Sequence, residues 1–413
     1  MKLVIAEKPS VAMALASVIG ARTRKDGYVE GNGYIVSWCV GHLVGLCDAS
    51  EYDEKYKKWK YEDLPIVPEY WKHKILEGTK KQFGILKKLM RDSKVDEVIC
   101  ATDAGREGEL IFRLVYEQAG CKKPMKRLWI SSMEEQAIKD GFASLKDGSC
   151  YDSLYQSALC RAKADWLVGI NASRLFSVLY NQNLKVGRVQ TPTLAMIVDR
   201  NQKIKEFTKE KYYMAHIKFD DMDAVTEHFQ KKEDADKVAA ECQERMCEVE
   251  KDDVKEKTVR PPKLYDLTTL QREANRMFGY TAQQTLDAVQ EMYEQKLVTY
   301  PRTDSQYLTD EMGESTETLI QMLLGKMPYA EGLEYQPDVS KVLNSKKVSD
   351  HHAIIPTVEV AKADIGKLKE RNCKILYLIS ARVLTATADP YIYESHKCQI
   401  TCNYHTFYLS AKK

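Results

Sequence analysis

Two short apolar runs, each followed by a polar turn and a helix pattern, constrain the fold more than any other feature. Residues Lys2–Ala6 predict a buried strand, and a helix follows over Val11–Ile19. Residues Asp96–Ala101 predict a second buried strand, with a loop over Thr102–Gly108 and a helix over Glu109–Gln118. Such units build an α/β sheet whose ligands bind at the carboxyl ends of its strands. We therefore predict an N-terminal α/β domain with a site in these loops.

The rest of the chain predicts helices, then strands, then helices again. Helical patterns with basic faces dominate residues 151–201, and residues 211–259 predict strands and turns with one acidic helix near 233–246. The pair Pro261-Pro262 marks a boundary, and two capping boxes follow it, Thr268-x-x-Gln271 and Thr281-x-x-Gln284. They predict a helix-turn-helix outline, which is weakly specific for DNA binding because most helix pairs bind none.

Composition sets broad limits. The 413 residues suffice for about two to four domains, and 44% are hydrophobic, which is enough for packed cores. The net charge is only +2, but residues 156–211 hold ten Lys/Arg against four Asp/Glu, and residues 220–256 hold fourteen acids against six bases. This distribution favours one surface made for a polyanion and one kept away from it, and the alternative is two ordinary solvated faces.

Absent motifs narrow the function classes. The eleven cysteines include no C-x-x-C pair, and neither a signal peptide nor a membrane-length apolar run occurs. We therefore expect reduced thiols, a cytoplasmic location and no membrane association. Without G-x-x-x-x-G-K-[ST], a nucleotide cofactor is not expected either.

Acidic residues follow both predicted strands. Glu7 comes directly after the first strand, and Asp103, Glu107 and Glu109 follow the second. Mg²⁺ prefers oxygen ligands and keeps several waters, so one or two carboxylates plus a phosphate suffice to hold it. Glu7 could instead act as a general acid or base, with Lys8 beside it as a phosphate ligand. The remaining alternative is a set of surface carboxylates at loop ends.

A phenol and a guanidinium stand two residues apart in the run Leu297–Ser305. Tyr300 is a candidate nucleophile, and Arg302 can hold a phosphate. Pro301 between them fixes its own φ and pushes Tyr300 toward extended conformations. We therefore predict that Tyr300 ends a strand and projects into a site, with Arg302 facing the same side. These two groups are the minimum for covalent phosphoryl transfer.

Basic and aromatic residues predict a nucleic-acid track. Arg161, Asp165 and Arg174 can share one side of a helix, with Trp166 adjacent, and Trp59 stands among lysines. Aromatic side chains can stack on unpaired bases, although core packing is the alternative for each single tryptophan. A loop that can hold a sugar-phosphate backbone follows, and its residues are Lys185, Val186, Gly187, Arg188, Val189 and Gln190.

Two adjacent histidines stand in the run from Asp350 to Thr357. A histidine near Tyr300 could hydrogen-bond a scissile phosphate or move a proton. A metal site using both His351 and His352 is conceivable, but adjacent side chains in an extended segment point to opposite faces. A structural role is the alternative for whichever histidine points away.

Five motifs in register resemble the type IA DNA topoisomerases, with the bacterial topoisomerase III branch the most similar. The resemblance covers nearly the whole chain. Its motifs are Ile5–Ser10, Asp103–Glu109, Gly187–Pro192, Thr299–Asp304 and His351–Thr357.

The resemblance implies a multidomain fold, an α/β Toprim domain followed by toroidal domains with helix-turn-helix-like modules. It implies that Tyr300 attacks single-stranded DNA and becomes linked to the 5′ phosphate, that a second strand passes, and that the 3′ hydroxyl reverses the reaction without ATP. The implied domains are 1–150 (Toprim), 151–210 (basic helical, DNA-binding), 211–260 (β-rich arch), 261–390 (carrying the tyrosine) and 391–413 (return of the arch).

Residue roles carry over by position. Glu7 matches the catalytic acid and metal neighbour, and Lys8 and Arg302 match contacts to the scissile phosphate. Asp103 and Glu107 match the Mg²⁺ acids, and His351 matches the catalytic histidine. The matched DNA-contacting positions are Trp59, Trp166, Arg174, Arg302 and Lys185 to Gln190.

Three departures from the family pattern bear on function. Gly105 stands where the family has a second aspartate, so metal affinity should fall unless Glu107 or Glu109 compensates. Lys185 replaces a serine and adds charge near DNA. Family members continue past the equivalent of Lys413, so an incomplete arch is expected.

We expect a topoisomerase acting on DNA with a single-stranded segment, in the cytoplasm with the nucleoid. One alternative is a DNA-binding fragment without full strand passage. Another is a Toprim nuclease or primase, which would not need the Tyr300-Pro301-Arg302 motif.

Overall fold

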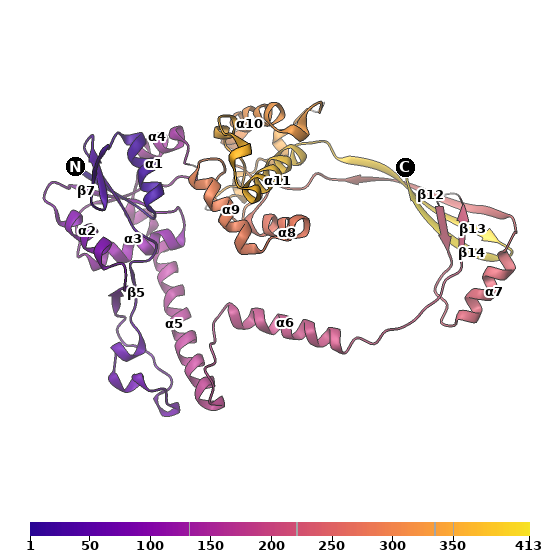
Figure 1. The fold of residues 1–413 in the computed structure, drawn as a ribbon, viewed down its shortest axis with the longest axis horizontal. Helices are drawn as coiled ribbons and strands as arrows, with labels where there is room; N and C mark the ends of the chain where they lie inside the picture. Colours follow the sequence, from indigo (N-terminus) through magenta and orange to yellow (C-terminus); the bar gives the residue numbers. More distant parts are fainter. Residues whose placement is uncertain (132, 220–221, 334–335, 350) are drawn as a thin grey trace. The chain divides into compact units, whose positions relative to one another are not determined.

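The computed structural model describes the chain except residues 132, 220–221, 334–335 and 350 (Figure 1). The described residues form two compact units. The first comprises Met1–Ala195 and Lys263–Ala386, and the second comprises Met196–Pro262 and Thr387–Lys413. The candidate site lies in the first unit.

A mixed sheet forms the N-terminal part of the first unit, with strand order β2-β3-β4-β1-β7-β8-β9. Strand β1 is parallel to both β4 and β7, and β7 is parallel to β8, so these strands end at one edge. The strands are β1 (Lys2–Ala6), β2 (Thr23–Lys25), β3 (Tyr28–Gly31), β4 (Tyr34–Trp38), β7 (Glu97–Ala101), β8 (Met125–Arg127) and β9 (Lys146–Asp147).

Both predicted strand-loop-helix units are present. Helix α1 (Pro9–Ile19) ends at Gly20, whose φ of 80° suits a residue without a side chain. Helix α3 (Arg106–Gln118) starts three residues before the predicted Glu109, so Glu107 lies in the first helical turn and not in the loop. Helix α1 packs on one face of the sheet, and α3 with α2 (Lys80–Arg91) covers the other.

Further elements extend this part of the unit. A small antiparallel pair, β5 (Val44–Leu46) and β6 (His73–Ile75), leads into the lobe that carries Trp59. Helix α4 (Glu135–Ala143) packs against α1, and the long helix α5 (Asp152–Tyr180) packs against α3 (Figure 1). Short 3-10 helices occupy connections at Ala49–Glu51, Glu54–Lys57, Tyr61–Asp63, Gly148–Tyr151, Asp310–Met312, Pro328–Ala330, Val339–Val342, Ser345–Lys347, Val358–Ala361 and Ile365–Lys367.

Helices dominate the C-terminal part of the first unit. The predicted Thr281/Gln284 capping box is confirmed at the start of α9. The Thr268 box is wrong, because Asp266 caps the preceding helix by accepting a bond from the Thr269 amide at 2.6 Å. The helices are α8 (Leu267–Phe278), α9 (Ala282–Glu294), α10 (Gly313–Lys326) and α11 (Glu370–Ala386).

The segment carrying Tyr300 is extended, but the predicted strand is wrong. Val298 makes only an isolated bridge to Pro356, and the Thr299 amide donates to the carbonyl of Ile355 at 3.0 Å. Pro301 has no amide hydrogen, so the ladder cannot continue past Tyr300. The Tyr300 amide instead donates to the carbonyl of Ser131 at 3.3 Å, which fixes the tyrosine against the N-terminal sheet domain.

The second unit is an antiparallel sheet with one helix. The strand order is β10-β11-β14-β13-β12, and the apolar side chains of α7 (Lys232–Cys242) pack on the sheet. The acidic helix predicted near 233–246 is thus present but ends at Cys242. The strands are β10 (His216–Phe219), β11 (Met222–Val225), β12 (Cys247–Val259), β13 (Tyr391–Cys402) and β14 (His405–Lys412).

Helix α6 (Gln190–Lys205) includes the boundary between the units and has no buried residue. Among the described helices, none combines the length and apolar content that a membrane span requires.

Candidate active site

A cavity of about 510 Å³ lies where β1 and β7 end. It brings together residues from the two strand-loop-helix units, from α5, from the Tyr300 segment and from the histidine motif. Its lining is Glu7, Lys8, Gly41, His42, Asp103, Ala104, Gly105, Arg106, Glu107, Gly108, Ile111, Arg161, Tyr300, Arg302 and His351. The residues that match the family's catalytic and Mg²⁺-binding positions therefore line one cavity, whereas Glu109 and His352 do not.

Tyr300 is buried at the wall of this cavity. Its hydroxyl donates to Oδ2 of Asp103 at 3.2 Å, and its ring lies 4.3 Å from the ring of His351, between centroids. Burial, together with the negative charge of Asp103, raises the pKa of the Tyr300 phenol above its usual value. The phenol is thus protonated near neutral pH and needs an acceptor for its proton in order to act as a nucleophile.

Glu7 and Asp103 form a close acidic pair. The Asp103 amide donates to Oε2 of Glu7 at 3.2 Å. Burial and then the charge of Asp103 raise the pKa of Glu7 to about 7, and burial also raises the pKa of Asp103. The pair therefore retains a proton at a pH where ordinary carboxyl groups have lost theirs.

The two cations beside Tyr300 are held by helix α9. Lys8 Nζ donates to Oε1 of Glu294 at 3.1 Å, and Arg302 Nη1 donates to Oε1 of Gln290 at 3.4 Å. The amide of Gln290 donates in turn to Glu294 at 3.1 Å. Sequence reasoning missed Gln290 and Glu294. The available signal was their spacing of four residues on the helix that precedes Tyr300, which puts both on one face.

His351 lies between the cavity and the N-terminal domain. Its Nε2 contacts the carbonyl of Ala104, and its Nδ1 lies 3.0 Å from the Ser131 hydroxyl. Because a carbonyl only accepts, Nε2 carries the proton, so Nδ1 accepts from Ser131. Burial lowers the pKa of His351 to about 4, so the ring is neutral near pH 7.

The two histidines point to different places, as predicted from the extended segment. His352 lines a separate cavity of about 810 Å³, next to α4, and not the one that holds Tyr300. Over the part of the chain that the structure describes, no three His, Cys, Asp or Glu side chains form a metal-ion cluster, and nothing supports a two-histidine site. Asp350 of the same motif lies outside the described residues.

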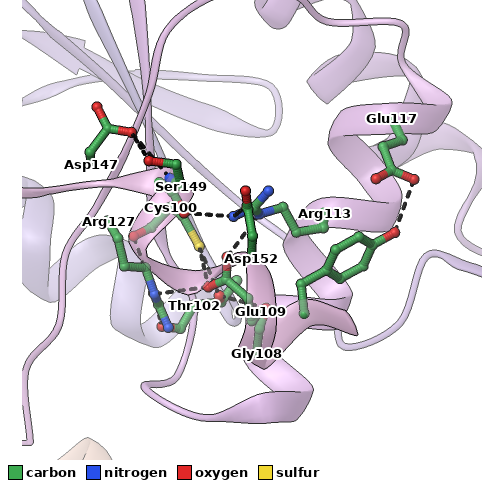
Figure 2. A network of polar contacts seen from close by, with 12 residues as sticks. Cys100, Thr102, Gly108, Glu109, Arg113, Glu117, Arg127, Asp147, Ser149 and Asp152 are labelled. Carbon is green, nitrogen blue, oxygen red and sulfur yellow. Dashed lines mark hydrogen bonds and ion pairs between the residues drawn. The ribbon is translucent and has the colours of Figure 1, made fainter. Parts of the chain in front are cut away.

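The remaining acids of the 103–109 run have different partners. Glu107 lies at the cavity wall, with His42 Nε2 and Arg161 Nη1 each 3.5 Å from its carboxylate. Glu109 faces away from the cavity and is 1% exposed, paired with Arg113 at 2.8 Å and Arg127 at 3.1 Å (Figure 2). Glu109 therefore cannot compensate for Gly105, which corrects one of the two alternatives left open above.

The network around Glu109 fixes the loop that carries Asp103 (Figure 2). Arg127 donates to the carbonyls of Thr102 at 2.7 Å and Asp103 at 2.8 Å. The Thr102 hydroxyl donates to the carbonyl of Gly108 at 2.7 Å. Gly108 admits no side chain, because an added Cβ would lie 2.1 Å from the Asp103 carbonyl oxygen. Sequence reasoning missed Arg127, whose only signal is a cation at the end of a short strand.

The donors of the cavity fit a divalent cation in their chemistry. Glu7 and Asp103 lie half-buried beside each other, and desolvation followed by their mutual repulsion raises the pKa of Glu7. Two carboxylates and a substrate phosphate suffice for Mg²⁺, so the fit does not require Glu107, whose carboxylate is engaged by His42 and Arg161.

The predicted DNA-contacting aromatics differ in exposure. Trp59 is 44% exposed and lies over the guanidinium of Arg174, 5.4 Å from ring centroid to Cζ, while Arg174 itself is 6% exposed. The indole N–H of Trp166 donates to the carbonyl of Cys47 at 2.9 Å, and its ring contacts other aromatics. Trp166 thus has a packing role, which is the alternative stated for single tryptophans.

The loop from Lys185 to Gln190 lies along α5. Ser173 Oγ accepts from the Val186 amide at 2.9 Å, and the Gly187 amide donates to the Thr191 hydroxyl at 3.1 Å. Arg188 pairs with Asp165 at 2.5 Å, and Val189 is 65% exposed. Gln190 begins α6.

Ion pairs connect the cavity with this loop. Arg161 lies 3.5 Å from Glu107 and 3.9 Å from Asp165, and Asp165 in turn holds Arg188. Arg161 and Asp165 therefore share a helix side as predicted, whereas Arg174 is buried under Trp59 and does not join them.

Comparison with known proteins agrees with this architecture. The family described as DNA topoisomerase matches residues 149–413, and the Toprim domain, a recognised metal-binding domain, matches residues 2–133. The chain is 44% identical to DNA topoisomerase 3 of Shouchella clausii, over 97% of this chain and 57% of that protein. It is 40% identical to DNA topoisomerase 3 of Staphylococcus haemolyticus, over 99% and 58% respectively. The chain thus spans less than two thirds of the length of these relatives.

A solved structure shares the fold. Full-length topoisomerase I from Thermotoga maritima superposes with a TM-score of 0.74 at 24% identity, covering 99% of this chain and 65% of that one. The predicted fold class, an N-terminal Toprim α/β domain followed by further topoisomerase domains, is confirmed, as is the resemblance to bacterial topoisomerase III. The chain belongs to the DNA topoisomerase family.

Proposed function

We propose that this chain is a type IA DNA topoisomerase, in which Tyr300 cleaves one DNA strand transiently and religates it after strand passage. Such a reaction relaxes negative supercoils or decatenates DNA without ATP. One observation carries the proposal: the Tyr300 hydroxyl donates to Asp103 at 3.2 Å inside a cavity that also holds Glu7, Lys8 and Arg302. A nucleophile, a proton acceptor, an acid and phosphate ligands are thereby within one site.

The cleavage step assigns a role to each acid. Asp103 accepts the proton of the Tyr300 phenol as the phenol oxygen bonds to phosphorus. The bond from phosphorus to the 3′ oxygen breaks, and Glu7, whose pKa is raised to about 7, gives that oxygen a proton. The products are a 5′-phosphotyrosine and a free 3′ hydroxyl. Religation runs the same transfers backward.

The neighbouring side chains stabilise the phosphate and orient the phenol. Lys8 and Arg302 flank the nucleophile and supply positive charge to the phosphate oxygens. His351 is neutral, and its ring lies against that of Tyr300 while both of its nitrogens are bonded to Ala104 and Ser131, so it orients the phenol by packing.

We propose Mg²⁺ as the cofactor, held by Glu7 and Asp103, with Glu107 able to join if it leaves His42 and Arg161. When bound, the ion would neutralise charge on the phosphate and on the acid pair.

DNA with a single-stranded segment is the proposed substrate. We assign its contacts to the exposed Trp59, to the loop from Lys185 to Gln190 and to Arg302. Of the other positions predicted from the sequence, the buried Arg174 contributes by holding the ring of Trp59, and Trp166 contributes by packing. The proposal keeps the domains predicted from the sequence, with boundaries at residues 150, 210, 260 and 390. It also includes a cytoplasmic location in association with the nucleoid.

A covalent-trapping experiment tests the proposal. Single-stranded DNA labelled at its 3′ end is incubated with the protein and Mg²⁺ and then denatured, because a 3′ label stays on the fragment joined through its 5′ phosphate. We expect labelled protein from wild type and none from Tyr300→Phe. Tyr293→Phe is the matched control, since Tyr293 is a buried neighbour at 5.4 Å between ring centroids and should still give the adduct. An adduct that survives Tyr300→Phe contradicts the assignment.

The second candidate function is binding or cleavage of single-stranded DNA without strand passage. Gly105, which stands in place of an acid, is the observation that favours it. Cleavage without strand passage predicts an adduct, and binding alone predicts none. Neither changes the linking number of a supercoiled plasmid, so a relaxation assay separates them from the topoisomerase reaction.

A further inference from the structure

Helix α9 holds Lys8 and Arg302, two of the cations that line the cavity, through two residues one turn apart. Glu294 Oε1 accepts from Lys8 Nζ at 3.1 Å and from the Gln290 amide at 3.1 Å. The side-chain carbonyl oxygen of Gln290, Oε1, accepts from Arg302 Nη1 at 3.4 Å. The result is one polar chain, Arg302–Gln290–Glu294–Lys8, that links two cations of the cavity. Neither Gln290 nor Glu294 lines the cavity, so they reach a substrate only through the two cations.

Lys8 has competing anionic partners close by. Glu7 and Asp103 line the same cavity, where burial raises the pKa of both carboxyl groups and the positive charge of Lys8 offsets part of that rise. In the described residues, however, the ion pair of Lys8 is with Glu294. Both side chains of this pair are about one-third exposed, at 31% and 30%, so the pair is partly desolvated and more than a surface contact.

The pair also joins two parts of the first unit that are far apart in sequence. Lys8 precedes α1 in the Toprim domain, and Glu294 is the last residue of α9, shortly before Tyr300. An ammonium group has three donors, so Lys8 can bond to Glu294 and to a phosphate oxygen at the same time. Substrate binding therefore does not require the pair to break.

We propose that Glu294 is a positioning residue for the cleavage reaction, holding Lys8 for the scissile phosphate and away from the Glu7–Asp103 pair. Gln290 extends the same function to Arg302. This inference rests on the proposed function and adds to it the means by which the cations keep their positions. Without the Glu294 carboxylate, Lys8 is free to pair with Glu7 or Asp103, which removes a phosphate ligand and occupies the acids.

A double-mutant cycle tests whether Glu294 acts through Lys8. The variants are Glu294→Gln, Lys8→Met and the double variant, and the readouts are the single-turnover rate of adduct formation and the affinity for the oligonucleotide. We expect Glu294→Gln to slow adduct formation about tenfold or more, because small misplacements of catalytic groups have effects of this size, with affinity changed less than about twofold. In the Lys8→Met background, Glu294→Gln should have no additional effect.

The same helix provides a matched control. Glu291 pairs with Lys369 at 2.7 Å and with Asn372, outside the cavity, so Glu291→Gln removes an equal charge without touching Lys8. This variant should form the adduct at the wild-type rate. Equal slowing by Glu294→Gln in both backgrounds, or no slowing at all, overturns the inference.

A second readout does not depend on cleavage. Lysine acylation by an activated ester, followed by peptide mass spectrometry, reports the accessibility of each ammonium group. Glu294→Gln should change the labelling of Lys8, because the ammonium group exchanges its partner, and should leave Lys369 unchanged. Glu291→Gln should change the labelling of Lys369 and leave Lys8 unchanged. If wild type forms no adduct, the proposed function fails, and this assay still decides the pairing. Unchanged labelling of Lys8 in Glu294→Gln contradicts the positioning role.

Discussion

Two clusters of charged residues arise from the same short stretch of chain and differ in how their charges are balanced. In the buried network, Glu109 is paired with two arginines, Arg113 and Arg127, and Arg113 also holds Asp152 at 2.8 Å (Figure 2). In the cavity, six residues earlier, Asp103 lies against another carboxylate, Glu7, and against the Tyr300 hydroxyl. The neighbouring cations Lys8 and Arg302 form their side-chain hydrogen bonds with Glu294 and Gln290 of α9, and not with these two acids.

The difference in charge balance separates a cluster that stabilises the structure from one that can react. A buried acid that is fully paired stabilises one conformation, and its removal leaves an unbalanced charge. A buried acid that faces another acid costs stability, shifts its pKa toward neutrality and gains the ability to exchange a proton or hold a cation. The paired cluster around Glu109 thus fixes the loop that carries Asp103. The acid pair of Glu7 and Asp103 depends on that fixed loop for its position in the cavity.

The first test of this comparison removes an arginine from the buried network around Glu109. Arg127→Met removes the ion pair with Glu109 and two bonds to loop carbonyls. We expect a loss of about 3–5 kcal/mol in the free energy of unfolding, measured with urea. Lys126→Met is the control, because Lys126 pairs with Asp147 at the surface and should cost less than about 1 kcal/mol. Equal effects of the two variants would show that the buried network does not hold the loop.

The second test removes one of the two neighbouring carboxyl groups in the cavity. Glu7 has a pKa of about 7 in the fold, against 4.5 for the ordinary group, so between these values the folded state binds more protons than the unfolded state. Stability of wild type therefore falls as the pH rises through this window. Glu7→Gln removes the cost, so we expect it to be more stable than wild type by about 1–3 kcal/mol near pH 8 in EDTA.

The pH dependence is the control for Glu7→Gln. Below about pH 4 the Glu7 carboxyl is mostly protonated in both states, so the gain should vanish. Urea unfolding at the two pH values measures it. A variant that is less stable than wild type near pH 8 would mean that the acid pair is already balanced in the fold.

The sequence predicted the second cluster better than the first. Glu7, Asp103, Tyr300 and Arg302 could be found because strand ends converge and because proline fixes the extended segment. Glu109 could not be separated from Asp103, because the side on which each acid lies depends on where α3 begins, and helix boundaries are set by local competition between caps.

Long-range partners explain the other failures. Arg127 and Glu294 act through contacts with residues far away in the chain, and no local pattern reports such contacts. The strand expected at Tyr300 was wrong for a related reason: its neighbour, the segment around Ile355, pairs for only a few residues.

The third prediction sharpens the comparison by adding an acid to the cavity. Position 105 is extended, caps α3, and leaves open space where a Cβ would be, so Gly105→Asp should fold without strain. It adds a third carboxylate, so the Mg²⁺ concentration at the midpoint of thermal stabilisation should fall about three- to tenfold. The Mg²⁺ needed for relaxation should fall likewise. An unchanged midpoint would argue against a missing ligand at this position.

The smallest effect is expected where charges are paired but exposed. Arg188 and Asp165 pair at 2.5 Å with side chains 47% and 43% exposed, so Asp165→Asn should change the free energy of unfolding by less than about 0.5 kcal/mol. It frees Arg188 for a phosphate, so affinity for single-stranded DNA should rise a few-fold at low salt, with a steeper salt dependence. Binding titrations at two salt concentrations measure both. If the affinity falls instead, the Asp165–Arg188 pair orders the loop from Lys185 to Gln190 for DNA binding. The pair then has a structural role like that of the buried network around Glu109, despite its exposure.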